Sequence, residues 1–366
     1  MNRQSSAPAG CRETAPGTAA PGNLFVCHTQ AQLILASGLA TERFARETND
    51  LILFVDFALR EEMRRRLERI FNRTLFLQSI YPKEYDTFRA KLSWYPADLK
   101  RIRAFMSQPY GRVFESCDTV FLEQRILKYA CKANPEAELI WLEDGITAYF
   151  QNVETHGGLD SNTLTRTLRK ALFKYLCGAG KYYDRDFAGM GGSRMLRTIY
   201  AQYPDAIREP YRSLRRAVGI TDSEYRSGLR ALYEKRALET DPNSVILVMD
   251  KLDTYLHPEK IRAAVSACLA AAKTQGREVV CKFHPRETEV WEEFEGIPAF
   301  DRSVGIESLY LSLLDRRETL RIVGVKSTGL ASAKKLGYRV ESLFGRSGET
   351  NPDLESFFRK IGIELL

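Results

Sequence analysis

Two short polar segments, far apart in the chain, place ionisable side chains where apolar runs typical of strands come to an end. The acidic pair Glu143 and Asp144 follows the apolar run 139–142, and His284 follows the apolar run 279–283. The carboxyl ends of parallel strands line the crevice in which α/β proteins bind their ligands. We therefore expect the acids to supply a base, and the imidazole an acid, to one cleft.

Each segment also contains a residue that fixes the backbone beside the ionisable groups. Gly145 allows a tight turn directly after the two acids, and Pro285 restricts the backbone directly after His284. A nearby phosphate would favour the protonated imidazole, which could then donate a hydrogen bond or a proton to a departing phosphoryl oxygen. Structural interpretations stay open, because acids after a strand are often helix caps and a histidine before proline can belong to a turn.

A third segment combines a strand, a turn of small residues and the start of a helix. The run 321–325 predicts a strand, and Ser327 and Thr328 open a helical pattern. Hydroxyl groups and free backbone amides at such a terminus bind phosphate without a metal, although Ser and Thr are also ordinary N-caps. Glu307, at the start of another predicted helix, is either a first-turn acid or an acceptor of hydrogen bonds from ribose hydroxyls.

The elements that position these residues form two α/β halves in a chain of 366 residues, a length that favours two domains. In each half, short apolar runs alternate with amphipathic stretches, as in a parallel sheet covered by helices. The turn-forming cluster 240–243 separates the halves. We predict two Rossmann-like, doubly wound domains that face a central cleft, 23–240 and 241–366, with the last helix, 352–361, packing back on the first domain.

Both halves show this alternation along their length, except between about 151 and 238. That region is basic and aromatic, and we predict a helical insert without strands, whose basic face is either solvated or grips an anionic, lipid-linked glycan. The predicted strands are 23–27, 51–56, 74–77, 118–122, 139–144, 244–249, 278–283, 321–325 and 339–343. The predicted helices are 30–37, 60–71, 97–107, 123–132, 258–273, 306–314, 328–336 and 352–361.

Composition excludes several classes of protein. The seven cysteines are odd in number and include no Cys-x-x-Cys pair, which argues against a disulfide framework or a structural zinc site and favours a reducing compartment. No apolar run approaches the ~20 residues needed to cross a bilayer, and we predict that residues 1–22 are a disordered leader rather than a secretory signal. The net charge of +7 favours acidic partners, but no nucleic-acid-binding motif accompanies the basic runs.

Three further motifs are better explained as structure. The Asp-x-Asp pattern at 184–186 is typical of metal-dependent transferases, but it follows no strand, so we predict a loop. The segment 178–181 lacks the spacing and the hydroxyl residue of a phosphate-binding P-loop. His257 precedes a second proline, but Pro258 has the position of a first helical residue, so His257 is predicted to be structural.

Taken together and in order, the motifs resemble those of bacterial sialyltransferases of the lipooligosaccharide sialyltransferase and alpha-2,8-polysialyltransferase families. The resemblance runs from about residue 23 to 343. It rests on the segment 23–32, on Glu143-Asp144-Gly145, on Lys-Phe-His-Pro at 282–285 and on Ser327-Thr328. Phe283 stands where many relatives have Pro, and Ser327-Thr328 stands where polysialyltransferases show Ser-Ser, which preserves a hydroxyl. The resemblance implies the two-Rossmann GT-B fold, CMP-sialic acid as donor, and catalysis without a metal or other cofactor.

The same resemblance implies roles for individual residues. The acidic pair supplies the catalytic base, with Glu143 ahead of Asp144, and His284 meets the CMP phosphate as an acid or an electrostatic stabiliser. The implied partners are a CMP-sugar donor and a glycan or glycolipid acceptor. From the lack of a nucleic-acid-binding motif, a secretory signal and a spanning segment in the sequence, we expect no nucleic-acid partner and a location in the cytoplasm, including the surface of the inner membrane. The residues implied to bind the nucleotide are Lys282, Pro285, Glu307, Ser327 and Thr328.

The function that follows is transfer of sialic acid to a hydroxyl of a surface glycan, either lipooligosaccharide or capsular polysaccharide, by a single inverting displacement. Kdo transfer from CMP-Kdo would use the same acid, base and phosphate site. Transfer of a polyol phosphate from a CDP-alcohol also suits this arrangement, but the phosphate itself would then move to the acceptor. A non-catalytic glycan-binding protein is the remaining alternative, and the simultaneous presence of base, acid and phosphate site counts against it.

Overall fold

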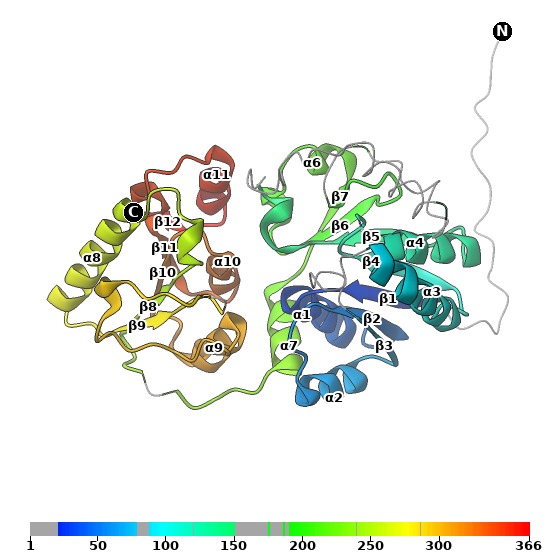
Figure 1. Cartoon of the computed structure of the whole chain (residues 1–366), viewed down its shortest axis with the longest axis horizontal. Coiled ribbons are helices and arrows are strands. Elements are labelled where there is room, and N and C mark those ends of the chain that lie inside the picture. The colour runs from blue at the N-terminus through cyan, green and yellow to red at the C-terminus, as the bar shows by residue number, and fades with distance from the viewer. Residues whose placement is uncertain are drawn as a thin grey trace, which may run out of the picture.

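The chain folds into two α/β domains that stand side by side (Figure 1). The computed structural model describes residues 21–78, 88–119, 121–150, 190–238, 240–285 and 287–366, together with Tyr175 and Asp186. The predicted GT-B architecture of two Rossmann-like domains is confirmed, with a parallel sheet in each domain. Most of the predicted leader lies outside the described residues, and Gly22 is already the first residue of β1.

The first domain contains a seven-stranded sheet in the order β3-β2-β1-β4-β5-β6-β7, in which all neighbours are parallel. The strand order reverses at β1, which is typical of a doubly wound sheet. Its strands are β1 (Gly22–Cys27), β2 (Asn49–Val55), β3 (Arg73–Gln78), β4 (Tyr110–Glu115), β5 (Glu138–Leu142), β6 (Thr198–Ala201) and β7 (Arg216–Gly219). Its helices include α1 (Gln30–Gly38), α2 (Glu61–Ile70), α3 (Phe88–Phe105), α4 (Phe121–Ala133), α6 (Tyr211–Leu214) and α7 (Asp222–Leu232).

The second domain contains a five-stranded sheet in the order β12-β11-β10-β8-β9, again with parallel neighbours. Its strands are short, and all except the edge strand at 364–365 are almost completely buried, as expected of a sheet covered on both faces. The strands are β8 (Val245–Val248), β9 (Val279–Lys282), β10 (Arg321–Gly324), β11 (Arg339–Ser342) and β12 (Glu364–Leu365). The helices include α8 (Pro258–Thr274), α9 (Ile306–Leu313), α10 (Thr328–Lys335) and α11 (Pro352–Lys360).

Helices α1 and α7 of the first domain lie on the side that faces α9 and α10 of the second (Figure 1). The first two helices pack closely at glycines: a Cβ atom on Gly38 would lie 2.0 Å from the carbonyl oxygen of Glu224, and one on Gly228 would lie 1.9 Å from that of Ile34. Helix α7 also contacts α9. The α1–α7 pair therefore connects the first sheet with the second domain.

The predicted strands other than 118–122 are confirmed within two residues at each end, and so are the predicted helices except the one at 97–107. That helix, α3, begins at Phe88, so Pro96, which precedes the predicted start, lies inside the helix.

The strand predicted at 118–122 is wrong, because the corresponding strand of the sheet is β4, Tyr110–Glu115. Asp118 lies in a turn after β4 and is completely buried. Its carboxylate accepts hydrogen bonds from the backbone nitrogens of Gly191 at 2.8 Å and Ser193 at 2.7 Å. Asp118 thus fixes the segment that leads into β6, and Phe121 already begins α4.

The prediction of a helical insert without strands at 151–238 is also wrong where the structure describes it. Residues 198–201 and 216–219 form β6 and β7, which extend the first sheet from β5. Each strand has only four residues. The first two residues of β7, Arg216 and Ala217, are exposed. Neither strand therefore gives a long apolar run in the sequence. The part of the predicted insert at 151–189 lies outside the described residues apart from Tyr175 and Asp186.

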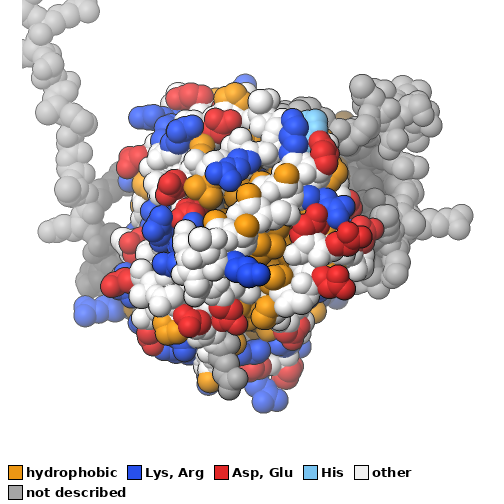
Figure 2. Space-filling model, turned by 90° about the vertical axis from the view of Figure 1, so that its left-hand side faces the viewer, with side chains coloured by type: hydrophobic (Ala, Val, Ile, Leu, Met, Phe, Trp, Pro, Cys, Tyr) orange, Lys and Arg blue, Asp and Glu red, His pale blue; other side chains and the backbone are white. Residues whose placement is uncertain are grey.

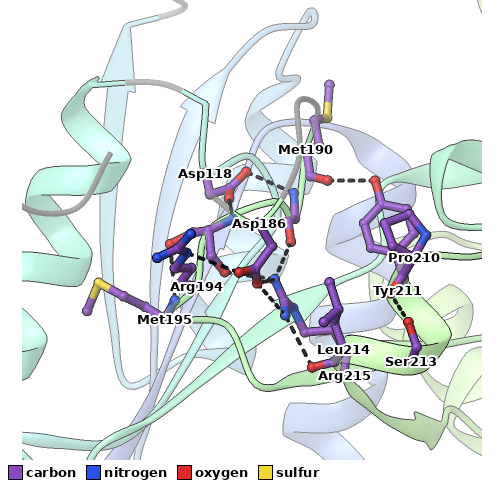
Figure 3. Close-up of polar contacts among 12 residues, drawn as sticks. Asp118, Asp186, Met190, Arg194, Met195, Pro210, Tyr211, Ser213, Leu214 and Arg215 are labelled. Carbon is purple, nitrogen blue, oxygen red and sulfur yellow. Dashed lines mark hydrogen bonds and ion pairs between the residues drawn. The ribbon is translucent and has the colours of Figure 1, made fainter. Parts of the chain in front are cut away.

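A buried ion pair holds the turn before β6 against the segment before β7 (Figure 3). The guanidinium of Arg215 is completely buried and lies 3.0 Å from the carboxylate of Asp186, which also pairs with Arg194 at 3.2 Å. Arg215 further donates to the backbone oxygen of Ser193 at 2.9 Å. The second acid of the Asp-x-Asp pattern is therefore part of this structural network.

We expect Arg215→Met to lower the free energy of unfolding by about 3 kcal/mol, because removal of one partner leaves a charge and several backbone oxygens uncompensated. Urea unfolding would measure the loss. The neighbouring Arg216 pairs with Glu138 at an exposed site, so Arg216→Met should change the free energy by less than about 1 kcal/mol. Equal stabilities of the two variants would contradict this role for Arg215.

The surface of the second domain carries mixed charge. Figure 2, which looks at the left-hand side of Figure 1, shows Lys and Arg side chains interspersed with Asp and Glu over this face. The basic excess of the chain is therefore not concentrated there. Within the described part of the chain, the helices are too short or too polar to span a lipid bilayer.

Candidate active site at the interdomain cleft

Glu143 lies directly after β5, at the carboxyl end of the first sheet, and is completely buried. Its carboxylate accepts hydrogen bonds from the hydroxyl of Tyr149, from the backbone nitrogen of Gln202 at 2.9 Å and from the side-chain amide of Gln202. Burial raises the pKa of Glu143 to about 7, although these bonds and the charge of Lys335 oppose the rise. A carboxyl group that titrates near neutral pH is suited to general base catalysis.

Asp144, the second acid, is partly exposed and is held by the amide of Gln32, which donates to its Oδ1 at 2.6 Å. The Gln32 side-chain oxygen accepts from the backbone nitrogens of His28 at 2.6 Å and Thr29 at 3.1 Å. Those two bonds fix which end of the amide faces Asp144. Gly145 follows with φ of 52°, in the left-handed region that glycine favours, so the predicted tight turn after the acids is confirmed.

His284 lies two residues after the end of β9 and lines two cavities between the domains. The first cavity, of about 560 Å³, is walled by Gln30, Asp56, Arg60 and Tyr233 of the first domain and by Pro285, Gly305 and Ser308 of the second, among others. The second, of about 570 Å³, is walled by Ile146 and Phe150 of the first domain and by Asp250, Lys326, Ser327, Thr328 and Asn351 of the second, among others. The imidazole thus lies where the two cavities meet.

Ser327 and Thr328 form the start of helix α10, beside His284 in the second cavity. The Ser327 hydroxyl caps the helix by accepting from the backbone nitrogen of Gly329 at 3.3 Å, while Thr328 is exposed. Lys326 is held by Glu349 at 3.0 Å and by the backbone oxygen of Thr254 at 2.9 Å. The helix terminus therefore offers hydroxyls and amide groups to an anion in this cavity.

Lys282 and Glu307 lie behind these groups rather than beside them. Lys282 is buried, and its ammonium donates to the backbone oxygens of Phe283 at 3.0 Å and Arg302 at 3.2 Å. Burial lowers the pKa of Lys282 and raises that of Glu307. Glu307 stands between Gly305 and Ser308, which both line the first cavity, and accepts from Ser332 at 3.5 Å. Their nucleotide-binding roles remain predictions.

The sequence matches the model of the family described as Alpha-2,8-polysialyltransferase (POLYST) over residues 23–338, which is most of the chain. The chain belongs to the alpha-2,8-polysialyltransferase family. As a member of this family it is a sialyltransferase-type glycosyltransferase, which takes a nucleotide-sugar donor and a glycan acceptor. No curated protein matches the sequence.

Solved structures that resemble this polysialyltransferase-family chain share its fold at low sequence identity. One is from Listeria monocytogenes and is assigned to the UDP-N-acetylglucosamine 2-epimerases, with 12% identity over 93% of this chain and 82% of that chain and a TM-score of 0.51. Another is the UDP-GlcNAc 2-epimerase from Neisseria meningitidis, bound to UDP-GlcNAc, with 12% identity over 93% and 90% of the two chains and a TM-score of 0.50. These likenesses concern the fold alone.

A cluster of charged groups beneath the first cavity of this polysialyltransferase-family chain was not predicted. His28, directly after β1, is buried between Asp56, 2.9 Å from its Nδ1, and the fully buried Glu123. Burial alone would lower the pKa of His28, but the two carboxylates raise it to about 10. Burial raises the pKa of nearby Asp144, and the hydrogen bond from Gln32 and the positive charge of His28 oppose that rise.

Other residues of the site differ in how strongly the sequence marks them. Thr29 and Gln32 have the Thr-x-x-Gln spacing of a capping box, a signal that could have located Gln32. The structure confirms that capping box at the start of α1. Gln202 and Lys335 carried no such signal, because they approach Glu143 only through the tertiary fold.

Proposed function

We propose that this chain is an inverting, metal-independent glycosyltransferase that moves sialic acid from CMP-sialic acid to a hydroxyl of a surface glycan. The observation that supports this proposal is the position of His284 beside Ser327 and Thr328 in one cavity, whose opposite wall includes Ile146, just beyond the acidic pair. In such a cleft, residues of the second domain can bind the leaving phosphate while an acid of the first domain accepts the proton of the attacking hydroxyl.

In the proposed reaction the phosphate of the donor lies against the start of α10. Ser327 and Thr328 would bind it through their hydroxyls and the free amides of the helix, and the positive end of the helix dipole would favour its charge. His284 would donate a hydrogen bond or a proton to the phosphate oxygen as its bond to the anomeric carbon breaks. The released CMP thus carries away the bonding electrons.

The acidic pair is proposed to supply the base, with Glu143 in that role. Its pKa of about 7 makes it half ionised at neutral pH, so it can take a proton from the acceptor hydroxyl as the oxygen attacks the anomeric carbon. The acceptor hydroxyl would approach Oε1, to which the Gln202 side chain donates, while the Tyr149 hydroxyl keeps its bond to Oε2. Asp144, which is partly exposed and held by Gln32, would bind the acceptor beside it.

The test is release of CMP and formation of glycan product from CMP-sialic acid, measured with and without oligosialic acid or lipooligosaccharide acceptors. CMP-Kdo and CDP-glycerol serve as competing donors. We expect turnover with CMP-sialic acid and a product linkage of inverted anomeric configuration, which NMR would identify. Turnover with CMP-Kdo alone would show that Kdo is the transferred sugar. Phosphorus in a product formed from CDP-glycerol would show that a polyol phosphate is transferred. A folded protein that turns over none of the three donors would contradict the proposal.

A further inference from the structure

The residues that hold Glu143 also contact the opposite domain. The hydroxyl of Tyr149 donates to Glu143 Oε2, and the ring of Tyr149 stacks on Phe357 of α11, with ring centroids 4.4 Å apart and planes inclined by 11°. Both aromatic side chains are buried. Helix α11 belongs to the second domain, so the acid of the first domain is held by a ring that the second domain supports.

A second set of contacts links Glu143 to helix α10. Gln202, which donates to Glu143 from its backbone and its side chain, accepts at its backbone oxygen from Lys335 Nζ at 3.0 Å. The hydroxyl of Tyr203 donates to the backbone oxygen of Ala331 at 2.7 Å. Ala331 and Lys335 lie on the helix that starts at the proposed phosphate site, so that helix and the acid are joined through a few direct contacts.

We propose that Tyr149 is a positioning residue that orients the Glu143 carboxylate, and that Phe357 of the opposite domain keeps Tyr149 in place. The proposal rests on the proposed function, in which Glu143 is the base. Helix α11 then has a role in the active site as well as in the packing of the fold. Its contact with Tyr149 sets the geometry and the protonation of Glu143 in the first domain.

The charged and titratable groups that face Glu143 determine the expected effect. They are Tyr149, Tyr203 and Lys335, and Lys335 pairs with Asp222 of α7 at 2.9 Å. The Tyr149 hydroxyl stabilises the ionised form and so lowers the pKa of Glu143 against the effect of burial. Loss of that hydroxyl should therefore move the pKa further above 7, and a smaller fraction of Glu143 would be ionised at neutral pH.

Tyr149→Phe keeps the ring that stacks on Phe357 and removes only the hydroxyl. We expect the acidic limb of kcat/KM to move to higher pH by about one unit, the shift expected for loss of one hydrogen bond. Activity should fall about tenfold below pH 7 and recover above pH 9. Tyr338→Phe is the matched control: its buried hydroxyl donates to the backbone oxygen of Tyr310 at 2.6 Å in the second domain, and the limb should stay in place.

Phe357→Leu removes the stacked ring and retains most of the apolar volume. If Phe357 acts through Tyr149, this variant should move the acidic limb in the same direction, and the double variant with Tyr149→Phe should shift it no further than Tyr149→Phe alone. Phe358→Leu, at the neighbouring buried ring of α11, should leave the limb unchanged. Additive losses of activity without movement of the limb would show that Phe357 is merely structural and would overturn the proposal.

A measurement without substrate separates this proposal from the proposed function. NMR of protein labelled with ¹³C at the glutamate carboxyl carbons follows the titration of Glu143, whose resonance is identified by its loss in Glu143→Gln. A higher midpoint in Tyr149→Phe and Phe357→Leu would support the positioning role even if the donor is not CMP-sialic acid. An unchanged midpoint in both variants would reject it, whatever the enzyme transfers.

Discussion

His284→Ala is expected to lower kcat for sialyl transfer from CMP-sialic acid by about 10²- to 10⁴-fold, the range typical of losing general acid assistance at a leaving group. The imidazole lies at the junction of the two interdomain cavities and beside the start of α10. Without it, charge on the departing phosphate is still opposed by Ser327, Thr328 and the helix terminus, and by the two lysines that line the same cavity, Lys251 and Lys326. Because the lost interaction is made chiefly in the transition state, KM for the donor should change much less than kcat.

The chain supplies a matched control for this substitution. His257 also precedes a proline, but it stands before the first residue of α8, is about half exposed and lies 3.7 Å from Glu259. His257→Ala should therefore retain near-normal kcat. Near-normal turnover in folded His284→Ala would remove the imidazole from the proposed mechanism.

A leaving group that needs no protonation provides a sharper test of the acid. If His284 donates a proton, the His284→Ala substitution should slow transfer less for a donor whose leaving group is a more stable anion than for CMP-sialic acid. If His284 only stabilises charge, the loss should be similar for both donors. Single-turnover measurements of bond cleavage would make this comparison without interference from product release.

The sequence located the catalytic candidates because each of them ends a buried strand. The runs 139–142 and 279–282 are almost completely buried, and they are apolar apart from Lys282. The first ionisable residues beyond these runs lie at the carboxyl edges of their sheets. A continuous apolar run is visible in the local sequence and is typical of a buried strand, so these positions could be predicted without a structure. The same reasoning placed Ser327 at the start of α10.

The partners of those residues could not be predicted in the same way. Gln202 reaches Glu143 from the end of β6, a four-residue strand that gave no clear apolar run. Phe357 reaches Tyr149 from the opposite domain. Asp118 was mistaken for part of a strand, since its binding of backbone nitrogens in a distant turn leaves no local pattern. Such contacts arise from tertiary packing, which single-sequence patterns do not encode.

The environment of Glu143 also predicts a pH dependence of stability. Its pKa is raised from 4.5 to about 7 in the folded chain, so between these pH values the folded state binds a proton that the unfolded state has released. The folded state is therefore stabilised at low pH, and this contribution is lost as the pH rises from about 4.5 to about 7, by about 3 kcal/mol in total. Urea unfolding of wild type relative to Glu143→Gln should show that fall, because glutamine does not titrate.

Glu143→Gln is expected to lower kcat/KM for sialyl transfer by about 10²- to 10⁴-fold, since the amide cannot accept a proton from the acceptor hydroxyl. The substitution preserves the size of a side chain that is completely buried. One end of the amide can still accept from Gln202 at 2.9 Å, so the tip of β5 should keep its position. The acidic limb of the pH profile, which wild type should show near pH 7, would be absent from the residual activity.

Asp144→Asn decides between the two acids. Asp144 is the more accessible of the pair, and Gln32 can still bind an amide oxygen there. If Glu143 is the base, Asp144→Asn should raise KM for the acceptor and leave the limb near pH 7 in place. If Asp144→Asn instead abolishes the limb while Glu143→Gln keeps it, Asp144 removes the proton and Glu143 supports the end of the strand. The proposed base would then move by one residue, and the positions of His284 and the phosphate site would be unaffected.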